Sequence, residues 1–165
     1  MASTSGTFSV YPSFLSYRVT ADEISSNPST NTSVVRVKAF LDNSTTYAES
    51  SGGSGTTTPG NWSYGYILFN APGSVEVYST DITVSHNPDG TGSYSFSGTS
   101  SMNGWGSAST GTGTLTLTAL NLAPGKRWNG TTWLDVVTAK RWNGSTWLDL
   151  TIKRRWNGST WLDIS

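Results

Sequence analysis

The one histidine in this 165-residue chain, His86, is the first residue to examine for catalysis. It begins the segment "HNPDGTG", in which Pro88 presets φ and Asp89-Gly90 suits a tight reversal. A histidine in a turn usually bonds to the backbone. We expect this role for His86 in preference to that of a general base or a ligand.

The oxygen-bearing side chains predict neither a metal site nor a hydrolase. Asn87 and Asp89 offer oxygen ligands to calcium, but calcium takes about six to eight of them. Glycoside cleavage needs two carboxylates across one bond, and Asp22-Glu23 and the scattered other acids form no such constellation. The chain has no cysteine, no G-x-S-x-G and no phosphate loop. We therefore expect no enzyme, no metal and no cofactor.

Aromatic residues indicate binding more strongly than any polar group indicates catalysis. Trp105 lies among glycine and serine in "SMNGWGSAS", and Trp62, Tyr64 and Tyr66 alternate so that one strand would place them on one face. Flat amphipathic rings stack on sugars. Trp105, Trp62, Tyr64 and Tyr66 are therefore candidate glycan-stacking residues. The alternative is that these rings fill the core or an interface.

The elements that position these residues are predicted to be strands. In "NTSVVRVKAFLD", Val35, Val37, Ala39 and Leu41 point one way and Val34, Arg36 and Lys38 the other. The segments "FLSYRVTADEI", "WSYGYILFNA", "SVEVYSTDITVSH", "GSYSFSGT" and "GTLTLTAL" are also rich in strand-forming residues. The glycine-rich segment 50–61 is expected to be a flexible loop.

Composition agrees with an all-β protein. The chain is 35% hydrophobic and 12% aromatic, which is too apolar for a disordered tail, and only 12% charged. Six to eight short strands predict a β-sandwich of immunoglobulin-like or jelly-roll type. No helical spacing of useful length is present.

Charge and tryptophan divide the chain into two parts. Residues 1–120 carry three basic and seven acidic side chains, whereas residues 121–165 carry seven basic and three acidic ones and six of the eight tryptophans. Pro124 and Gly125 interrupt the preceding strand. We predict a sandwich domain at residues 1–120, a linker at 121–125 and a hairpin-repeat module at 126–165.

The second part repeats one phrase every 14 residues: "KRWNGTTWLDV", "KRWNGSTWLDL" and "RRWNGSTWLDI". Each copy is predicted to be a β-hairpin with a four-residue loop, in which tryptophan faces tryptophan and a basic residue faces aspartate. A two-residue Asn-Gly turn is the alternative, but it sets tryptophan against threonine. The repeat core would then consist of Trp128, Trp133, Trp142, Trp147, Trp156 and Trp161.

A lone hairpin is marginally stable in water, so these rings need cover from other copies. Either the three hairpins of one chain form a small prism, or chains associate and each repeat forms a layer of a stem. We favour a homo-oligomer, a trimer above others. Arginine beside tryptophan also suits single-stranded nucleic acid, but the neutral chain argues against that partner, and a polyanionic or sugar surface fits better.

Two motifs resemble phage structural proteins. "DITVSHNPDGTGSYSFSGTS", followed by "TGTLTLTAL" and preceded by Asn31 to Ser33, is similar to a family of minor structural proteins of long-tailed bacteriophages over roughly residues 14–120. The most specific part of this resemblance is about ten residues long. The tryptophan repeat resembles W-N-G-x-x-W hairpins near the ends of phage tail and fibre proteins. The resemblance implies a virion β-sandwich, usually on the tail, and assigns no catalytic residues.

These observations predict a bacteriophage virion structural protein, a minor tail or tail-tip component that mediates assembly and host-surface attachment. The alternatives are a capsid decoration or head-fibre protein, and a carbohydrate-binding module for host cell-wall glycan. Expected partners are other virion proteins and host carbohydrate. We expect no membrane partner, because no apolar run approaches the roughly 18 residues of a spanning helix. Without a signal peptide, assembly in the host cytoplasm is expected.

Overall fold

The computed structural model describes residues 1–120, 126–128, 131, 133–135, 139–150, 154–156 and 161–163. The predicted linker, residues 121–125, lies outside these ranges. The first twelve strands are β1 Ala2–Thr7, β2 Leu15–Asn27, β3 Thr32–Asn43, β4 Ala48–Ser50, β5 Gly53–Thr57, β6 Asn61–Tyr64, β7 Ile67–Phe69, β8 Gly73–Ser85, β9 Ser93–Phe96, β10 Gly98–Met102, β11 Gly106–Ser109 and β12 Gly113–Thr116. The last six are β13 Lys126–Trp128, β14 Trp133–Asp135, β15 Ala139–Trp142, β16 Trp147–Leu150, β17 Arg154–Trp156 and β18 Trp161–Asp163.

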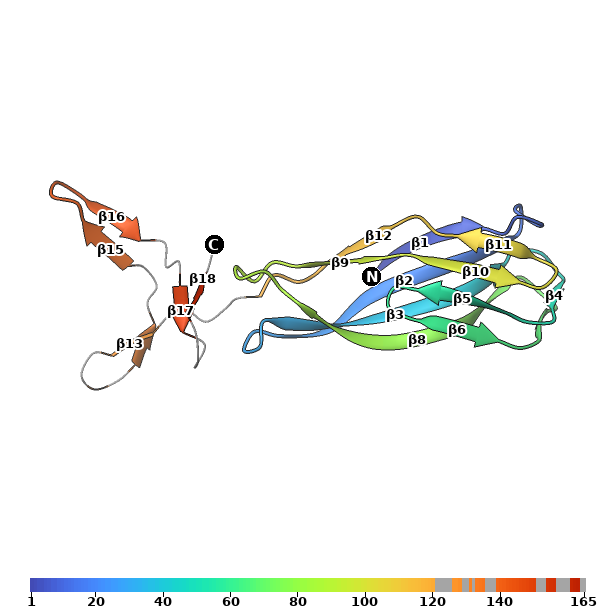
Figure 1. Ribbon diagram of the computed structural model, residues 1–165, viewed down its shortest axis with the longest axis horizontal. Coiled ribbons are helices and arrows are strands. Elements are labelled where there is room, and N and C mark those ends of the chain that lie inside the picture. The colour runs from blue at the N-terminus through green and yellow to red at the C-terminus, as the bar shows by residue number, and fades with distance from the viewer. Residues whose placement is uncertain are drawn as a thin grey trace.

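Two four-stranded antiparallel sheets form the body of the molecule (Figure 1). One has the strand order β1-β2-β3-β8 and the other β11-β10-β5-β6. The two-stranded ladders β12-β9 and β4-β7 complete this part of the chain. Every described element is a strand, so the predicted all-β class is confirmed.

The centre of the first sheet shows the predicted alternation. Strand β3 pairs with β2 on one side and β8 on the other, which leaves one face for the core. Val35, Val37, Ala39 and Leu41 are all fully buried on that face. The second sheet contributes Trp62, Met102 and Ala108 to the same core cluster, and its β10–β11 turn contributes Trp105. Period-two hydrophobicity thus predicts the orientation of β3 correctly.

The glycine-rich segment 50–61 is not a flexible loop, and that prediction is wrong. Its residues 53–57 form β5, which lies between β10 and β6 in the second sheet. A Cβ added at Gly55 would collide with the Trp62 ring and the Thr99 carbonyl oxygen. Glycine is therefore required here because neighbouring groups approach the backbone closely, not because the segment needs freedom.

Two segments that read as single strands are each divided in two. "WSYGYILFNA" becomes β6, which joins the second sheet, and β7, which pairs with β4 instead. "GSYSFSGT" becomes β9 and β10, which pair with β12 and with β5 and β11. The chain leaves one sheet and enters another at each break, so a continuous pattern of strand-forming residues did not reveal it.

The three carboxy-terminal hairpins have the predicted register. In the first, Trp128 faces Trp133 and Lys126 faces Asp135. The second pairs Trp142 with Trp147 and Lys140 with Asp149, and the third pairs Trp156 with Trp161 and Arg154 with Asp163. In the second hairpin the backbone N–H of Asn143 donates to the Thr146 carbonyl, which closes a four-residue loop. The alternative two-residue turn is excluded for these pairs.

Candidate functional site

Trp105, the first candidate for sugar stacking, lies inside the protein. Its side chain is 2% exposed and packs edge-on against Phe8, with ring centroids 5.5 Å apart. The indole Nε1 donates a 2.6 Å hydrogen bond to the Glu49 carbonyl oxygen. Its glycine and serine neighbours form a tight reversal between β10 and β11 that turns the ring inward. The prediction that Trp105 presents its ring to a ligand is wrong.

Trp62 is buried as well, so a stacking role for it is also wrong. It is 6% exposed, and its Nε1 donates to the Tyr17 hydroxyl at 3.2 Å. That hydroxyl in turn donates to the Thr56 carbonyl at 3.1 Å, which ties β2 of one sheet to β5 of the other. Burial raises the pKa of Tyr17 to about 12, although the hydrogen bond from Trp62 opposes the shift. This pair holds the core together.

The two tyrosines of the predicted set are exposed. Tyr64 is 40% and Tyr66 is 61% exposed. Tyr64 is the last residue of β6 and follows Trp62 by two positions on the same face, whereas Tyr66 lies between β6 and β7 and does not continue that face. Of the four candidates, the structure therefore leaves Tyr64 and Tyr66 open to a ligand.

Tyr66 belongs to a cluster that the sequence did not reveal. Its hydroxyl donates to Glu49 Oε2 at 3.1 Å, and the Tyr47 hydroxyl donates to the same oxygen at 2.6 Å. Glu49 faces Leu68 across the β4-β7 ladder. Tyr47 and Leu68 are 56% and 40% exposed. We name these four residues, Tyr47, Glu49, Tyr66 and Leu68, the tyrosine ribbon.

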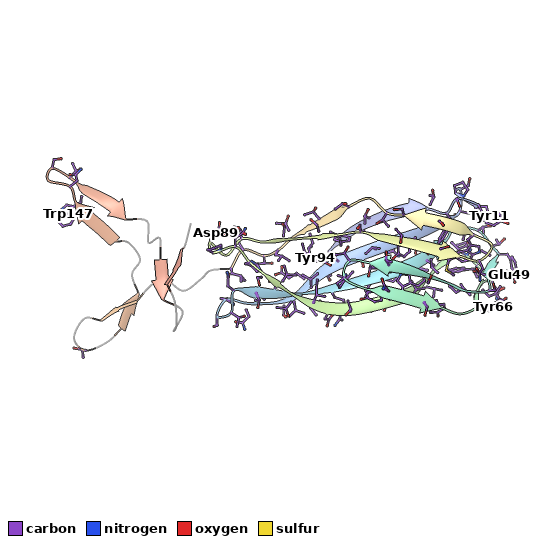
Figure 2. The ribbon with its side chains drawn as sticks, in the orientation of Figure 1. Tyr11, Glu49, Tyr66, Asp89, Tyr94 and Trp147 are labelled. Atoms are coloured by element: carbon purple, nitrogen blue, oxygen red, sulfur yellow. The ribbon has the colours of Figure 1, made fainter. Side chains whose placement is uncertain are left out.

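The tyrosine ribbon lies at one end of the sandwich. Figure 2 shows Glu49 and Tyr66 at this end, together with Tyr11, and Asp89 at the opposite end. The inner residues of the same ladder, Ala48, Ile67 and Phe69, are buried in the core. Alternation along two short strands thus turns Glu49 and Leu68 outward above an apolar inner face, and Tyr47 and Tyr66 directly precede the two strands.

Electrostatics distinguish this end from the outer face of the first sheet. The three basic side chains of residues 1–120 each pair with a carboxylate on that sheet: Arg18 with Asp42 at 2.8 Å, Arg36 with Asp81 at 2.7 Å and Lys38 with Glu76 at 2.6 Å. Glu49 instead accepts two phenol protons. These hydrogen bonds to Glu49 raise the pKa of both Tyr47 and Tyr66. The ribbon is therefore an aromatic surface with one negative charge.

His86 has the predicted structural role. Its side chain is 7% exposed, and Nδ1 lies 2.8 Å from the Gly90 carbonyl oxygen within the turn. Its Nε2 lies 2.7 Å from Ser33 Oγ, which donates to Glu23 Oε1 at 2.5 Å. Ser33 is 1% exposed, so no substrate reaches its hydroxyl. The arrangement joins β2, β3 and the turn, and it does not form a nucleophile–base pair open to solvent.

The described residues contain no cluster suited to a metal ion. No three histidine, cysteine, aspartate or glutamate side chains among them meet at one point. Asp89 Oδ1 accepts hydrogen bonds from the backbone N–H and the hydroxyl of Thr91, which uses this oxygen within the turn. Within the same part of the chain, no helix has the length and apolar character needed to cross a bilayer.

Of the six hairpin tryptophans, Trp147 is the one whose side chain the structure describes. Trp147 is 63% exposed, so the single chain leaves most of this ring open to solvent. The predicted burial of Trp128, Trp133, Trp142, Trp156 and Trp161 lies outside the described side chains. What the structure establishes is the backbone register that places the tryptophans of each hairpin opposite one another.

The fold is that of an all-β protein with a two-sheet body that has an aromatic end, followed by repeated hairpins. The chain belongs to the family described as siphovirus protein of unknown function (DUF859), which matches residues 13–157. The match extends beyond the expected 14–120 and includes the first two hairpins. No curated protein and no solved structure matches the chain. Membership supports a virion-associated phage protein in general and confirms the resemblance to a phage protein family. The resemblance of the tryptophan repeat to hairpins of tail and fibre proteins stays a prediction.

Proposed function

We propose that this siphovirus protein is a non-enzymatic structural component of the virion, at the tail or its tip. In this proposal residues 1–120 form a sandwich domain, residues 121–125 a linker and residues 126–165 an assembly module. Other virion proteins are its partners, and it joins the particle in the host cytoplasm. The observation that carries the proposal is the identical tryptophan–tryptophan register of three successive hairpins.

The physical argument for assembly starts from the weakness of a single hairpin. Two three- or four-residue strands bury too little apolar surface to be independently stable. Because Trp147 is 63% exposed in one chain, an apolar surface from another chain would bury this ring further. Association of chains supplies that surface in each repeat, and three repeats multiply the gain. This favours a homo-oligomer, with a trimer as the simplest closed stem.

Light scattering on the purified full chain tests the assembly part of the proposal. We expect the wild-type chain to be an oligomer. Trp147→Ser removes an exposed ring, so this variant should begin to dissociate at a higher protein concentration than the wild type. Tyr64→Ser is the matched control, since it removes a 40% exposed ring from the sandwich instead. A wild-type chain that is monomeric at every concentration would contradict the proposal.

Electron microscopy of intact virions, labelled with an antibody against the sandwich, tests the position. Label on the tail supports the minor tail or tail-tip role. Label on the head supports the alternative, a capsid decoration or head-fibre protein. Purified particles that lack the protein altogether would contradict both roles.

A second candidate function is attachment to host-surface carbohydrate, as a carbohydrate-binding module. The observation that favours it is the exposure of Tyr64 and Tyr66, because tyrosine rings combine an apolar face with a polar edge. Binding to host cell wall that requires Tyr66 would support this function. Turnover of purified wall polymer would instead contradict the non-enzymatic proposal.

A further inference from the structure

The tyrosine ribbon concentrates hydrogen-bond acceptors. Tyr47 and Tyr66 each have one hydroxyl proton, and both protons go to Oε2 of Glu49. The phenol oxygens keep lone pairs, and a carboxylate is an acceptor only. The polar atoms of these three side chains can therefore accept further hydrogen bonds but have no proton left to donate. A ligand that binds here must itself supply the donors.

The same residues present flat apolar surface beside those acceptors. The side chains of Tyr47 and Tyr66 are 56% and 61% exposed, and Leu68 is 40% exposed directly across the ladder from Glu49. Tying the hydroxyls to Glu49 restricts both phenol rings without covering them, which lowers the entropy lost on binding. Hydroxyl groups beside C–H faces are the chemistry of a sugar ring, and tyrosine suits both parts.

The charge of the tyrosine ribbon limits the class of sugar that can bind there. Within residues 1–120 the basic side chains of Arg18, Arg36 and Lys38 are engaged with carboxylates on the first sheet. The ribbon carries the Glu49 charge, and a negative site repels sulfated, phosphorylated or uronic-acid polymers. It attracts an ammonium group and tolerates a neutral hydroxyl.

The ribbon is also supported from within. The Glu49 backbone carbonyl accepts the Trp105 indole proton, and Phe69 of β7 packs at 6.1 Å from the Trp105 ring. Inside the ladder, the Ser50 hydroxyl donates to the Asn103 carbonyl at 2.8 Å. Two short strands are thus anchored to the turn between β10 and β11, so the ligand would meet a preformed surface.

From these contacts we infer that the tyrosine ribbon is a carbohydrate-binding site for neutral or amino sugars that offer free hydroxyl or ammonium donors. The inference deepens the attachment role proposed above and rests on it. Tyr47 and Tyr66 supply ring faces, Leu68 adds apolar contact, and Glu49 accepts hydrogen bonds from the sugar. Binding does not need the hairpin repeats.

A glycan array probed with the full chain tests the inference. The array carries neutral glucan oligosaccharides, their amino-sugar counterparts and sulfated oligosaccharides. We expect retention on the first two classes and none on the third. Tyr47→Ala and Tyr66→Ala should each weaken binding about tenfold, which corresponds to the loss of one good ring contact. Glu49→Gln should weaken the amino-sugar signal more than the neutral one.

Tyr11→Ala is the matched control. Tyr11 is a 43% exposed tyrosine at the same end of the sandwich, but it stacks on Phe14 and not on the ribbon. Its substitution should leave binding unchanged. Circular dichroism of each variant should match the wild type, since all the substituted side chains are at the surface. Equal losses for Tyr11→Ala and Tyr66→Ala would overturn the assignment to the ribbon.

Two further results would overturn the inference. One is a folded wild-type chain that binds no sugar on the array. The other is binding only to lysine-rich peptides, printed on the same array for comparison, with a steep salt dependence, which would make the partner a basic protein. Immunoblots of purified virions separate these failures from failure of the proposed function. Protein present in particles with a blank array contradicts the inference and the attachment role but leaves the virion role intact, whereas its absence from particles contradicts the virion role.

Discussion

Trp105 and Glu49 are 56 residues apart in the sequence, yet the indole Nε1 of Trp105 donates a 2.6 Å hydrogen bond to the Glu49 carbonyl oxygen. The ring that donates is 2% exposed, and the residue that accepts carries the surface carboxylate of the tyrosine ribbon. The core and the candidate binding surface are therefore joined through the backbone of one short strand. A substitution at Trp105 should therefore alter the stability of the tyrosine ribbon at the surface.

Trp105→Phe tests this coupling. The substitution keeps an aromatic ring but leaves the Glu49 carbonyl without its donor, which should cost about 1–3 kcal/mol of the free energy of unfolding. Amide hydrogens of β4 and β7 should exchange faster with solvent than in the wild type. Trp147→Phe, in a hairpin, is the control and should leave exchange in the ribbon unchanged. Unaltered exchange in Trp105→Phe would show that the bond does not hold the ribbon.

The sequence predicted the parts of the fold in which neighbouring residues carry the information. Val35 and Val37 alternate with charged residues, so the buried face of β3 follows from period two alone. The hairpin register follows from matching partners at equal distances from each turn, as for Trp142 and Trp147. In both cases the deciding residues lie within one or two strands of each other along the chain.

The candidate site could not be predicted, because its residues come from short strands with no measurable period. Strands β4 and β7 have three residues each. Nothing local to Tyr47 or Glu49 indicates that Tyr66 shares their carboxylate. The exposure of Trp105 was predicted wrongly for the same reason. The glycine and serine residues around it are typical of an open loop, and only the distant partners Phe8 and Glu49 show that the ring is buried.

Ionisation of the buried Tyr17 hydroxyl should lower the stability of the folded protein at high pH. Burial raises its pKa from 10.0 to about 12 in the folded protein, so the unfolded chain releases this proton first as the pH rises. The stabilising contribution is complete below pH 10 and is lost between pH 10 and about pH 12. Urea denaturation across this range should show a steeper decline for the wild type than for Tyr17→Phe. Equal slopes would contradict the raised pKa.

Glu23 should make stability fall at low pH. Burial disfavours its charged form, but hydrogen bonds from Ser33 and Thr118 and the nearby His86 outweigh burial and hold the pKa of Glu23 below its usual 4.5. A lowered folded pKa contributes stability above the unfolded value, and this contribution is lost as the pH falls through the folded value. The wild type should denature at lower urea concentrations as the pH falls below about 4.5.

Ser33→Ala supplies the comparison for Glu23. It removes the hydroxyl that donates to Glu23 Oε1 at 2.5 Å and contacts His86 Nε2 at 2.7 Å. The variant should be less stable at neutral pH by about 1–3 kcal/mol, since the buried His86 and the partly exposed Glu23 each lose a partner. Its acid-induced loss of stability should be smaller than that of the wild type. An unchanged acid response would show that Ser33 does not lower the pKa of Glu23.

Gly144→Ala should weaken the second hairpin and, through it, the assembly. Gly144 has a φ of 103°, a conformation that alanine adopts only with strain. The loop around it is otherwise well bonded, because Asn143 Oδ1 accepts the backbone N–H groups of Ser145 and Thr146 at 2.9 and 2.8 Å. Strain of about 1 kcal/mol in one repeat should raise the dissociation constant of the oligomer about fivefold per chain. Light scattering measures this constant, and Thr146→Ser, which keeps the turn hydroxyl, is the control. If Gly144→Ala assembles like the wild type, the second hairpin does not help to hold the chains together.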